Sequence, residues 1–318
     1  MTIKLILPWV GELPWYWPLF EASVKHAGIE LGLVRGDVEY FRKRVEEGLP
    51  GIARCGLQDG YKLCDLKPMY GRIFAAEIGD ADYWAFGDCD LVYGRMMRAW
   101  LKRMTDESVD VACVRRDWTS GPFTLMRNCE KVNSLYERAE NWREVVESPH
   151  HCGFDELGHN WLTRHWYGGV SMERLRSEGN FAGVMWRTDD VKFVHEDVLC
   201  EDGLGHGEVK MRPDGRLMFN DGEIAAFHFI GVKQALGFNV NGVLSDVDAG
   251  YVLTRDGYWD DSWANRCRLR VLVEIAKRRT MGLLGFAYKC LKGNRGARLR
   301  LKRVALRNLG AKNWWKYV

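Results

Sequence analysis

The chain lacks the features that define several common protein classes. Its nine cysteines are odd in number, lie far apart and never form a C-x-x-C pair, which argues against a disulfide framework or a zinc ribbon. No apolar run reaches the roughly 18 residues that a spanning helix needs. Near the start, Pro8, Gly11 and Pro14 interrupt the short apolar run, and no small-residue cleavage site follows. We therefore expect a cytoplasmic protein, neither exported by an obvious signal nor integral to a membrane.

Internal repeats and low-complexity tracts are also missing. With 318 residues, 47% of them hydrophobic and 28% charged, the chain has enough apolar material for a large core. These values exclude a disordered chain, a fibre and a disulfide-stabilised mini-protein.

The net charge of +3 conceals an uneven distribution. Residues 264–318 contain sixteen Lys and Arg against the single acid Glu274, a net charge of +15, which leaves −12 on residues 1–263. We accordingly predict two parts, an acidic domain over residues 1–263 and a basic tail over residues 264–318.

Apolar runs alternate with helical patterns through the first half of the chain. Strands are expected at 3–7, 29–34, 83–86, 109–114, 123–126 and 223–230, and helices at 14–25, 66–78, 95–104, 129–146 and 154–165. Such alternation predicts an α/β fold with a mostly parallel central sheet and flanking helices. The glycine-rich stretch 201–222 is interpreted as a mobile loop or an irregular hairpin, and a substrate lid is one alternative for it.

The strongest local signal is Asp88-Cys89-Asp90, which directly follows the apolar run 83–86. Two carboxylates at the end of such a strand lie at the sheet edge where open α/β folds bind ligands. Because side chains alternate along an extended chain, both can point the same way and hold Mg²⁺ or Mn²⁺ on a diphosphate. A solvated turn is the simpler interpretation of this motif alone.

A second signal lies in residues 227–233. His228 leaves an apolar run and can supply a nitrogen ligand, Gly231 allows close approach of a phosphate, and Lys233 adds a positive charge. His228 alone is more typical of a structural histidine than of a metal ligand. Together, the carboxylates, the imidazole and the lysine are the parts that a metal–nucleotide-diphosphate site requires.

Several segments in order resemble a little-characterised family of bacterial glycosyltransferase-like proteins found in surface-polysaccharide biosynthesis. The resemblance covers about residues 3–233 and is carried by 7–11, 61–71, 83–91, 121–128 and 154–156. The segment 228–233 is also similar to the metal- and diphosphate-binding signature of the retaining glycogenin and lipooligosaccharide galactosyltransferase group. This resemblance implies a GT-A fold, Rossmann-like with a mostly parallel sheet.

The resemblance also implies roles for individual residues. Asp88, Asp90 and His228 would hold the cation, with Gly231 and Lys233 on the diphosphate. A nucleoside pocket is implied at the end of the first strand, and contacts to base, ribose or phosphate are implied just before the metal strand. The residues concerned are Pro8, Trp9 and Gly11 for the pocket, and Lys62, Asp65 and Lys67 for the contacts. For the last three, a helix start with a solvated lysine is the alternative.

Asp155 and Glu156 are the candidate catalytic carboxylates at the sugar end. The resemblance implies that an acid here holds sugar hydroxyls or stabilises positive charge at the anomeric carbon. Helix capping by Asp155 is the alternative. Glu156 replaces the Gln common in the glycogenin-like group, so retention is only slightly favoured over inversion. A zinc site of His150, His151, Cys152 and His159 fits no standard spacing.

The basic tail mixes apolar and cationic residues and ends in Trp314-Trp315-Lys316-Tyr317. Basic amphipathic helices with aromatic residues bind anionic membrane surfaces, each cation adding about 1 kcal/mol. Nucleic acid attracts the same charge, but no nucleic-acid-binding motif is present. We therefore expect a tail on the inner face of the cytoplasmic membrane, with a solvated basic face as the alternative.

Taken together, these observations predict a Mg²⁺- or Mn²⁺-dependent glycosyltransferase that moves a sugar from a nucleotide-diphosphate sugar to a growing surface glycan. A glycan or lipid-linked glycan would be the acceptor. Two other classes stay open. A nucleotidyl- or phosphosugar-transferase also uses paired carboxylates and a divalent cation, and a non-catalytic membrane- or nucleic-acid-binding module would need only the tail.

Overall fold

The computed structural model describes residues 1–52, 54–116, 121–156, 180–201, 207–230, 246–254 and 257–260, and four single positions between 276 and 288. Contacts divide the chain into two compact units. The first comprises residues 1–201 and 211–229, and the second comprises residues 202–210 and 230–318. The predicted boundary at residue 264 falls outside the described residues.

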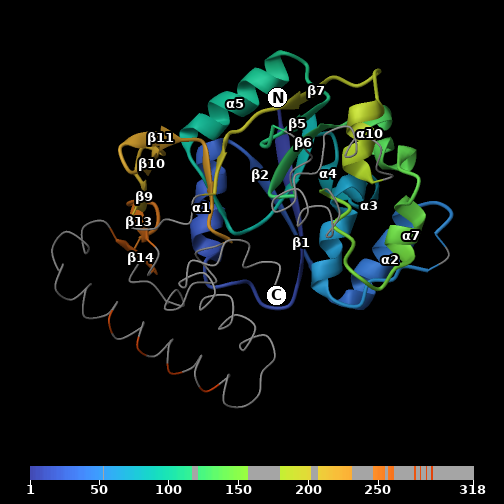
Figure 1. Cartoon of the computed structure of the whole chain (residues 1–318), viewed down its shortest axis with the longest axis horizontal. Helices are drawn as coiled ribbons and strands as arrows, with labels where there is room; N and C mark the ends of the chain where they lie inside the picture. Colours follow the sequence, from blue (N-terminus) through green and yellow to red (C-terminus); the bar gives the residue numbers. More distant parts are fainter. Residues whose placement is uncertain are drawn as a thin grey trace, which may run out of the picture. The chain divides into compact units, whose positions relative to one another are not determined.

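The first unit is built on a six-stranded sheet (Figure 1). Its strands follow the spatial order β2-β1-β3-β6-β5-β7. They are β1 (Ile3–Val10), β2 (Glu30–Gly36), β3 (Tyr83–Gly87), β5 (Val111–Cys113), β6 (Phe123–Arg127) and β7 (Phe193–His195). The pairs β1–β2, β1–β3 and β5–β7 are parallel, and in this sheet only β6 runs antiparallel to both neighbours. This confirms the predicted α/β class with a largely parallel central sheet.

Both faces of this sheet are covered by hydrophobic clusters, and its central strands are mostly apolar, with Lys4 in β1 and Arg127 in β6 as charged exceptions. Leu5, Leu7 and Ala85 face one hydrophobic cluster, and Ile6 and Phe86 face the other. Helices α1 (Trp17–Ala27) and α5 (Arg95–Asp106) supply residues to the first cluster. Helices α2 (Val38–Gly48), α7 (Trp142–Glu147) and α10 (Phe181–Arg187) supply residues to the second.

A smaller three-stranded sheet lies in the same unit. It joins β4 (Leu91–Tyr93), β12 (Ala226–His228) and β8 (Leu199–Cys200), in the order β4-β12-β8. His228 pairs with Leu91 across the antiparallel β4, and Phe227 pairs with Cys200 across the parallel β8. This register places the residues next to the paired positions, Asp90 and Glu201, beside the end of β12.

Two of the predicted helices are wrong in length. The region 129–146 is α6 (Glu130–Asn133), a 3₁₀ helix η2 (Leu135–Arg138) and α7, separated by an extended Ala139. This break lets Tyr136 and Trp142 pack edge to face with ring centroids 5.2 Å apart. The region 66–78 is likewise divided among a 3₁₀ helix η1 (Gly60–Met69), α3 (Tyr70–Ile73) and α4 (Ala75–Ile78).

The glycine-rich stretch is in part a hairpin, as one of the two interpretations predicted. It contains β9 (Glu208–Met211), followed by β10 (Leu217–Phe219) and β11 (Gly222–Ile224), which pair antiparallel around Asn220 at φ 52°. In the second unit β13 (Tyr251–Thr254) and β14 (Gly257–Asp260) form another antiparallel pair. Among the described residues no helix combines the length and apolarity needed to cross a bilayer.

Candidate functional site

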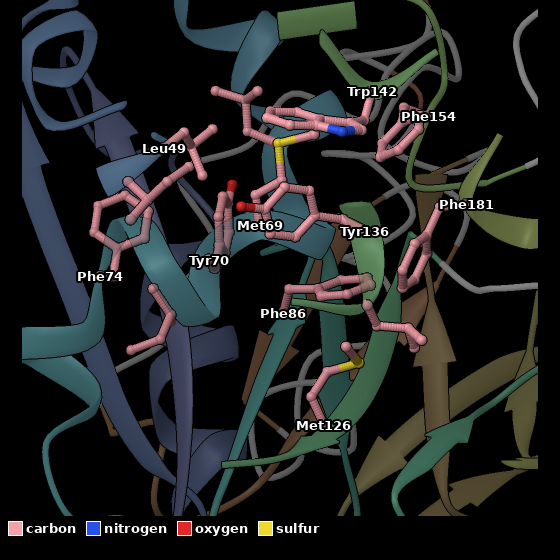
Figure 2. Close-up of a cluster of buried hydrophobic side chains, with 14 of the residues drawn as sticks. Leu49, Met69, Tyr70, Phe74, Phe86, Met126, Tyr136, Trp142, Phe154 and Phe181 are labelled. Carbon is pink, nitrogen blue, oxygen red and sulfur yellow. The ribbon is translucent and has the colours of Figure 1, made fainter. Parts of the chain in front are cut away.

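Core residues hold the site's side chains in place. Phe86, Met69 and Phe154 belong to one buried cluster, which Figure 2 shows together with Tyr70 and Trp142. Each of the first three lies one or two residues from a predicted site residue: Phe86 precedes Asp88, Met69 follows Lys67, and Phe154 precedes Asp155. The backbone at these positions is therefore anchored by close packing, which limits the freedom of the attached side chains.

The structure brings Asp88, Asp90 and His228 together. One donor atom of each lies within 4.8 Å of the donor atoms of the other two. Asp88 follows β3, whereas Asp90 precedes β4 and His228 ends β12, so the two sheets meet at this group. The Phe229 N–H donates to the Asp90 carbonyl at 3.1 Å and fixes the register between the two segments. Two carboxylates and an imidazole form a donor set suited to Mn²⁺ or a similar divalent cation.

The surroundings of the His228 ring show most clearly whether a metal ion fits this group. Its Nε2 is buried and lies 3.3 Å from Asp90 Oδ2, yet the contact lacks hydrogen-bond geometry and no described residue supplies another partner. A buried polar atom without a partner is costly. A cation bound between Nε2 and the Asp90 carboxylate would give Nε2 a partner, so the residues present fit a metal ion.

Lys67 is buried and holds three groups of the site. Its Nζ lies 2.7 Å from Asp88 Oδ1 and 3.1 Å from Asp155 Oδ2, and it donates to the Gly121 carbonyl at 2.9 Å. Burial works to lower the pKa of Lys67, but the two carboxylates outweigh burial and raise that pKa, so the side chain is a permanent cation. It links the metal group to the predicted sugar-end carboxylates.

Lys62 and Asp65 form a separate buried ion pair, with Nζ 2.7 Å from Oδ2. Asp65 also accepts from the backbone N–H groups of Cys152 and Phe154, at 2.8 and 3.0 Å, and Lys62 donates to the His150 carbonyl at 2.7 Å. These hydrogen bonds hold the segment 150–154 against η1. Both side chains are thus occupied within the protein, and their predicted contacts with base, ribose or phosphate stay a prediction.

Asp155 and Glu156 lie beside Gly121. The Gly121 N–H donates to Glu156 Oε1 at 3.2 Å, and a Cβ placed at residue 121 would stand 2.7 Å from Asp155 Oδ2 and 2.9 Å from Glu156 Oε1. Only glycine fits this position without displacing a carboxylate. Residues 154–156 form a turn, and the remainder of the predicted helix, residues 157–165, lies outside the described residues.

Burial dominates the electrostatics of these two acids. It raises the pKa of Asp155 to about 7, against the lowering effect of Lys67, and it raises the pKa of Glu156 as well. Both groups also repel each other and Asp88. The site therefore concentrates more negative charge than its lysine neutralises, which favours a bound cation.

The end of β1 lies at the same sheet edge as Asp88, since Ile6 pairs with Phe86 in the parallel register. The three residues predicted for a nucleoside pocket, Pro8, Trp9 and Gly11, are there. Trp9 Nε1 donates to the Glu12 carbonyl at 2.9 Å, and Gly11 has a left-handed φ of 87°. Of these three residues Pro8 is buried, Trp9 is half-buried and Gly11 is exposed, and their predicted contact with a nucleoside stays a prediction.

Gly231, Lys233 and His159 lie outside the described residues, so their predicted roles stay predictions. Glu201 was not predicted from the sequence; it follows β8, and its Oε1 lies 2.5 Å from His228 Nδ1. Arg115 was not predicted either; it follows β5 and forms an ion pair with Glu201. The available signal was position alone, since each follows a short apolar run as Asp88 does.

Two solved structures are similar at low identity. One is a glycosyltransferase involved in the glycosylation of the major capsid of PBCV-1, with 11% identity, TM-score 0.33, and coverage of 63% of this chain and 85% of that one. The other is A197 from STIV, with 13% identity, TM-score 0.29, and coverage of 71% and 97%. No curated protein sequence matches.

The sequence of residues 30–229 matches a protein family described as a family of unknown function, DUF6625. The matched segment contains β2 to β12 and so includes Lys67, Asp88, Asp90, Asp155 and His228. It spans more than half of the 318 residues. The chain therefore belongs to the DUF6625 family.

Proposed function

We propose that this protein is a metal-dependent glycosyltransferase that uses a nucleotide-diphosphate sugar. The observation that carries the proposal is the convergence of Asp88, Asp90 and His228 at the carboxyl end of β3, within 4.8 Å of one another. Ligands of open α/β sheets bind at that edge. Mn²⁺ or Mg²⁺ held there would neutralise the charge that develops on a leaving diphosphate.

The protein's own residues would divide the remaining work. Lys67 would hold Asp88 and Asp155 close to each other through its two ion pairs. The metal group and the carboxylates at the sugar end would thereby keep a constant relative position. Asp155 and Glu156 would hold sugar hydroxyls or stabilise positive charge at the anomeric carbon. Gly231 and Lys233 would contact the diphosphate, as the sequence predicts. The proposed acceptor is a surface glycan or a lipid-linked glycan, and retention of anomeric configuration is slightly favoured.

Donor binding is expected to require the cation. Calorimetric titration with UDP-, GDP- and CDP-sugars, with and without Mn²⁺, tests this directly. Asp90→Asn and His228→Ala should abolish both cation-dependent binding and transfer. Asp214→Asn and His26→Ala, which alter the same residue types away from the group, are the matched controls. If no sugar nucleotide in the panel binds in a cation-dependent way, the proposal is wrong.

A nucleotidyl- or phosphosugar-transferase is the second candidate, since the same carboxylates and cation would serve it. The products distinguish the two reactions. A glycosyltransferase releases a nucleoside diphosphate, whereas the second candidate releases pyrophosphate or a nucleoside monophosphate. Chromatography of the nucleotide products after incubation with an acceptor extract decides between them.

For the basic tail we propose binding to an anionic membrane surface on the cytoplasmic side. The net charge of +15 over residues 264–318 and their interspersed apolar residues support this. Such a location would bring the catalytic unit close to lipid-linked acceptors.

A further inference from the structure

Glu201 and Arg115 lie behind the candidate metal group and have no role in the function proposed so far. Glu201 follows β8, and the parallel pairing of Phe227 with Cys200 sets it beside His228. Its Oε1 lies 2.5 Å from His228 Nδ1. Arg115, at the end of β5, forms an ion pair with Glu201 and is itself largely buried. These contacts form a chain from Arg115 through Glu201 to the ring of His228.

The direction of the hydrogen bond determines the state of the imidazole. An ionised carboxylate only accepts hydrogen bonds, so the neutral ring must carry its proton on Nδ1 to bond Glu201. Nε2 then presents its lone pair on the opposite side of the ring, 3.3 Å from Asp90 Oδ2. Two acceptors facing each other repel, which explains why this buried contact is no hydrogen bond. A cation bound between Nε2 and Asp90 Oδ2 would relieve this repulsion.

We propose that Glu201, held by Arg115, is a positioning residue that fixes His228 in the Nδ1–H tautomer and so directs the Nε2 lone pair to the cation. This inference concerns the metal group of the proposed function and rests on it for the identity of the ligand. Carboxylates behind metal-bound histidines orient the ring, and their loss typically weakens metal binding about 10- to 100-fold.

Arg115 also connects Glu201 electrostatically to Glu156, one of the two carboxylates predicted to act on the sugar. Glu156 acts on Arg115 electrostatically, in addition to the ion pair that Arg115 makes with Glu201. One guanidinium thus stabilises a carboxylate behind the metal group and faces a carboxylate of the sugar end. Replacing Arg115 by Met should weaken the hold on Glu201 without removing the Glu201–His228 contact.

Two measurements on the full chain test the positioning role. Long-range ¹H–¹⁵N NMR of ¹⁵N-histidine-labelled protein, without metal, reports the tautomer of His228, which is assigned by its absence in His228→Ala. Electron paramagnetic resonance of free Mn²⁺ reports the affinity. Wild type should show the Nδ1–H tautomer. Glu201→Ala should shift the ring toward Nε2–H and bind Mn²⁺ about 10- to 100-fold more weakly.

The conservative variant and a control separate positioning from a loss of structure. Glu201→Gln keeps an acceptor for Nδ1–H and should retain the tautomer with a smaller loss of affinity, and Arg115→Met should fall between these two variants. Glu196→Gln changes an acid that instead bonds Trp100 and Arg103, and should leave both readouts at wild-type values.

Failure of this inference differs from failure of the proposed function. If wild type shows Nε2–H, or if Glu201→Ala keeps both the tautomer and the Mn²⁺ affinity, the positioning role is wrong, although metal-dependent transfer can stand. If wild type binds no Mn²⁺ but loses its Nδ1–H tautomer on Glu201→Ala, Glu201 still fixes the tautomer of His228, and the Mn²⁺ site of the proposed function is wrong.

Discussion

Lys67 connects the two halves of the candidate site with a single ammonium group. Its sequence signal was weak, because Lys67-Pro68 at a predicted helix start is equally typical of a solvated lysine. The structure instead buries the side chain between Asp88 and Asp155. Whether a lysine near a helix start is solvated or buried depends on residues far away in sequence, here those around Gly121 and Asp155. Neighbouring residues alone could not predict it.

Replacing Lys67 should cost more stability than an ordinary core substitution. Lys67→Met removes the cation between the buried Asp155 and Asp88, whose side chain is 29% exposed, so the loss should approach about 3–5 kcal/mol, the value typical of a broken buried ion pair. Urea unfolding without metal measures the loss. The double variant Lys67→Met/Asp155→Asn removes one of the repelling charges and should recover part of it. A loss below about 1 kcal/mol in the single variant would contradict the buried-ion arrangement.

Asp155 should make stability depend on pH in an unusual direction. Its pKa is raised from 3.8 to about 7 in the folded protein, chiefly by burial. Between these values the folded state binds the proton more tightly than the unfolded state, so this group's contribution to stability decreases as pH rises from about 4 to about 7. The slope is at most about 1.4 kcal/mol per pH unit.

Asp155→Asn mimics the protonated acid and removes this contribution. Thermal unfolding without divalent metal, measured from pH 5 to 7, should therefore be less pH-dependent in the variant than in wild type. Asp190→Asn is the control, because Asp190 pairs with Arg138 at the surface and its pKa is lowered. An unchanged profile in Asp155→Asn would show that Asp155 ionises normally.

At the scale of elements, the sequence predicted the strands better than the helices. The apolar runs 3–7, 83–86 and 123–126 all became strands of the central sheet, because continuous apolar stretches of that length are buried on both faces. The prediction of one continuous helix over residues 129–146 was wrong. The hydrophobic periodicity cannot show that the backbone at Ala139 is extended, which lets Tyr136 and Trp142 pack against each other. The structure brings Asp88, Asp90 and His228 within 4.8 Å of one another, and their common signal in the sequence was a position at the end of an apolar run.

The ion pair of Lys62 and Asp65 should control the order of the segment 150–154. Asp65→Asn keeps the shape of the side chain but leaves a single acceptor oxygen, which cannot accept from the N–H groups of both Cys152 and Phe154 in the present geometry. It also leaves Lys62 without its charge partner. Amide hydrogen exchange at Cys152 and Phe154, whose N–H groups Asp65 accepts, should become faster by more than an order of magnitude. Asp37→Asn, which alters only the cap of α2, is the control. Unchanged exchange at both amides would show that the pair does not hold this segment.

For the whole molecule, the division of charge between residues 1–263 and 264–318 predicts salt-dependent membrane binding. Replacing Lys277, Arg278 and Arg279 by Glu in the full chain should weaken association with anionic vesicles by at least about 100-fold, at roughly 1 kcal/mol for each cation lost. Flotation with phosphatidylserine vesicles at several NaCl concentrations measures this. Vesicles of neutral lipid are the control, and equal flotation of variant and wild type would contradict a surface-binding tail.

The metal group also has a mechanical consequence. Asp88 directly follows β3 of the six-stranded sheet, whereas Asp90 directly precedes β4 and His228 ends β12 of the three-stranded sheet, so one ion bound to all three would crosslink the two sheets. Ligand binding that requires the folded state stabilises it by RT ln(1 + [L]/Kd), or about 2.7 kcal/mol at a hundredfold excess over Kd. A rise in melting temperature with Mn²⁺ that disappears in Asp90→Asn would show this. The ion would then hold the two sheets together before a sugar donor binds. The concentration of available metal would therefore affect the fraction of the protein that is folded.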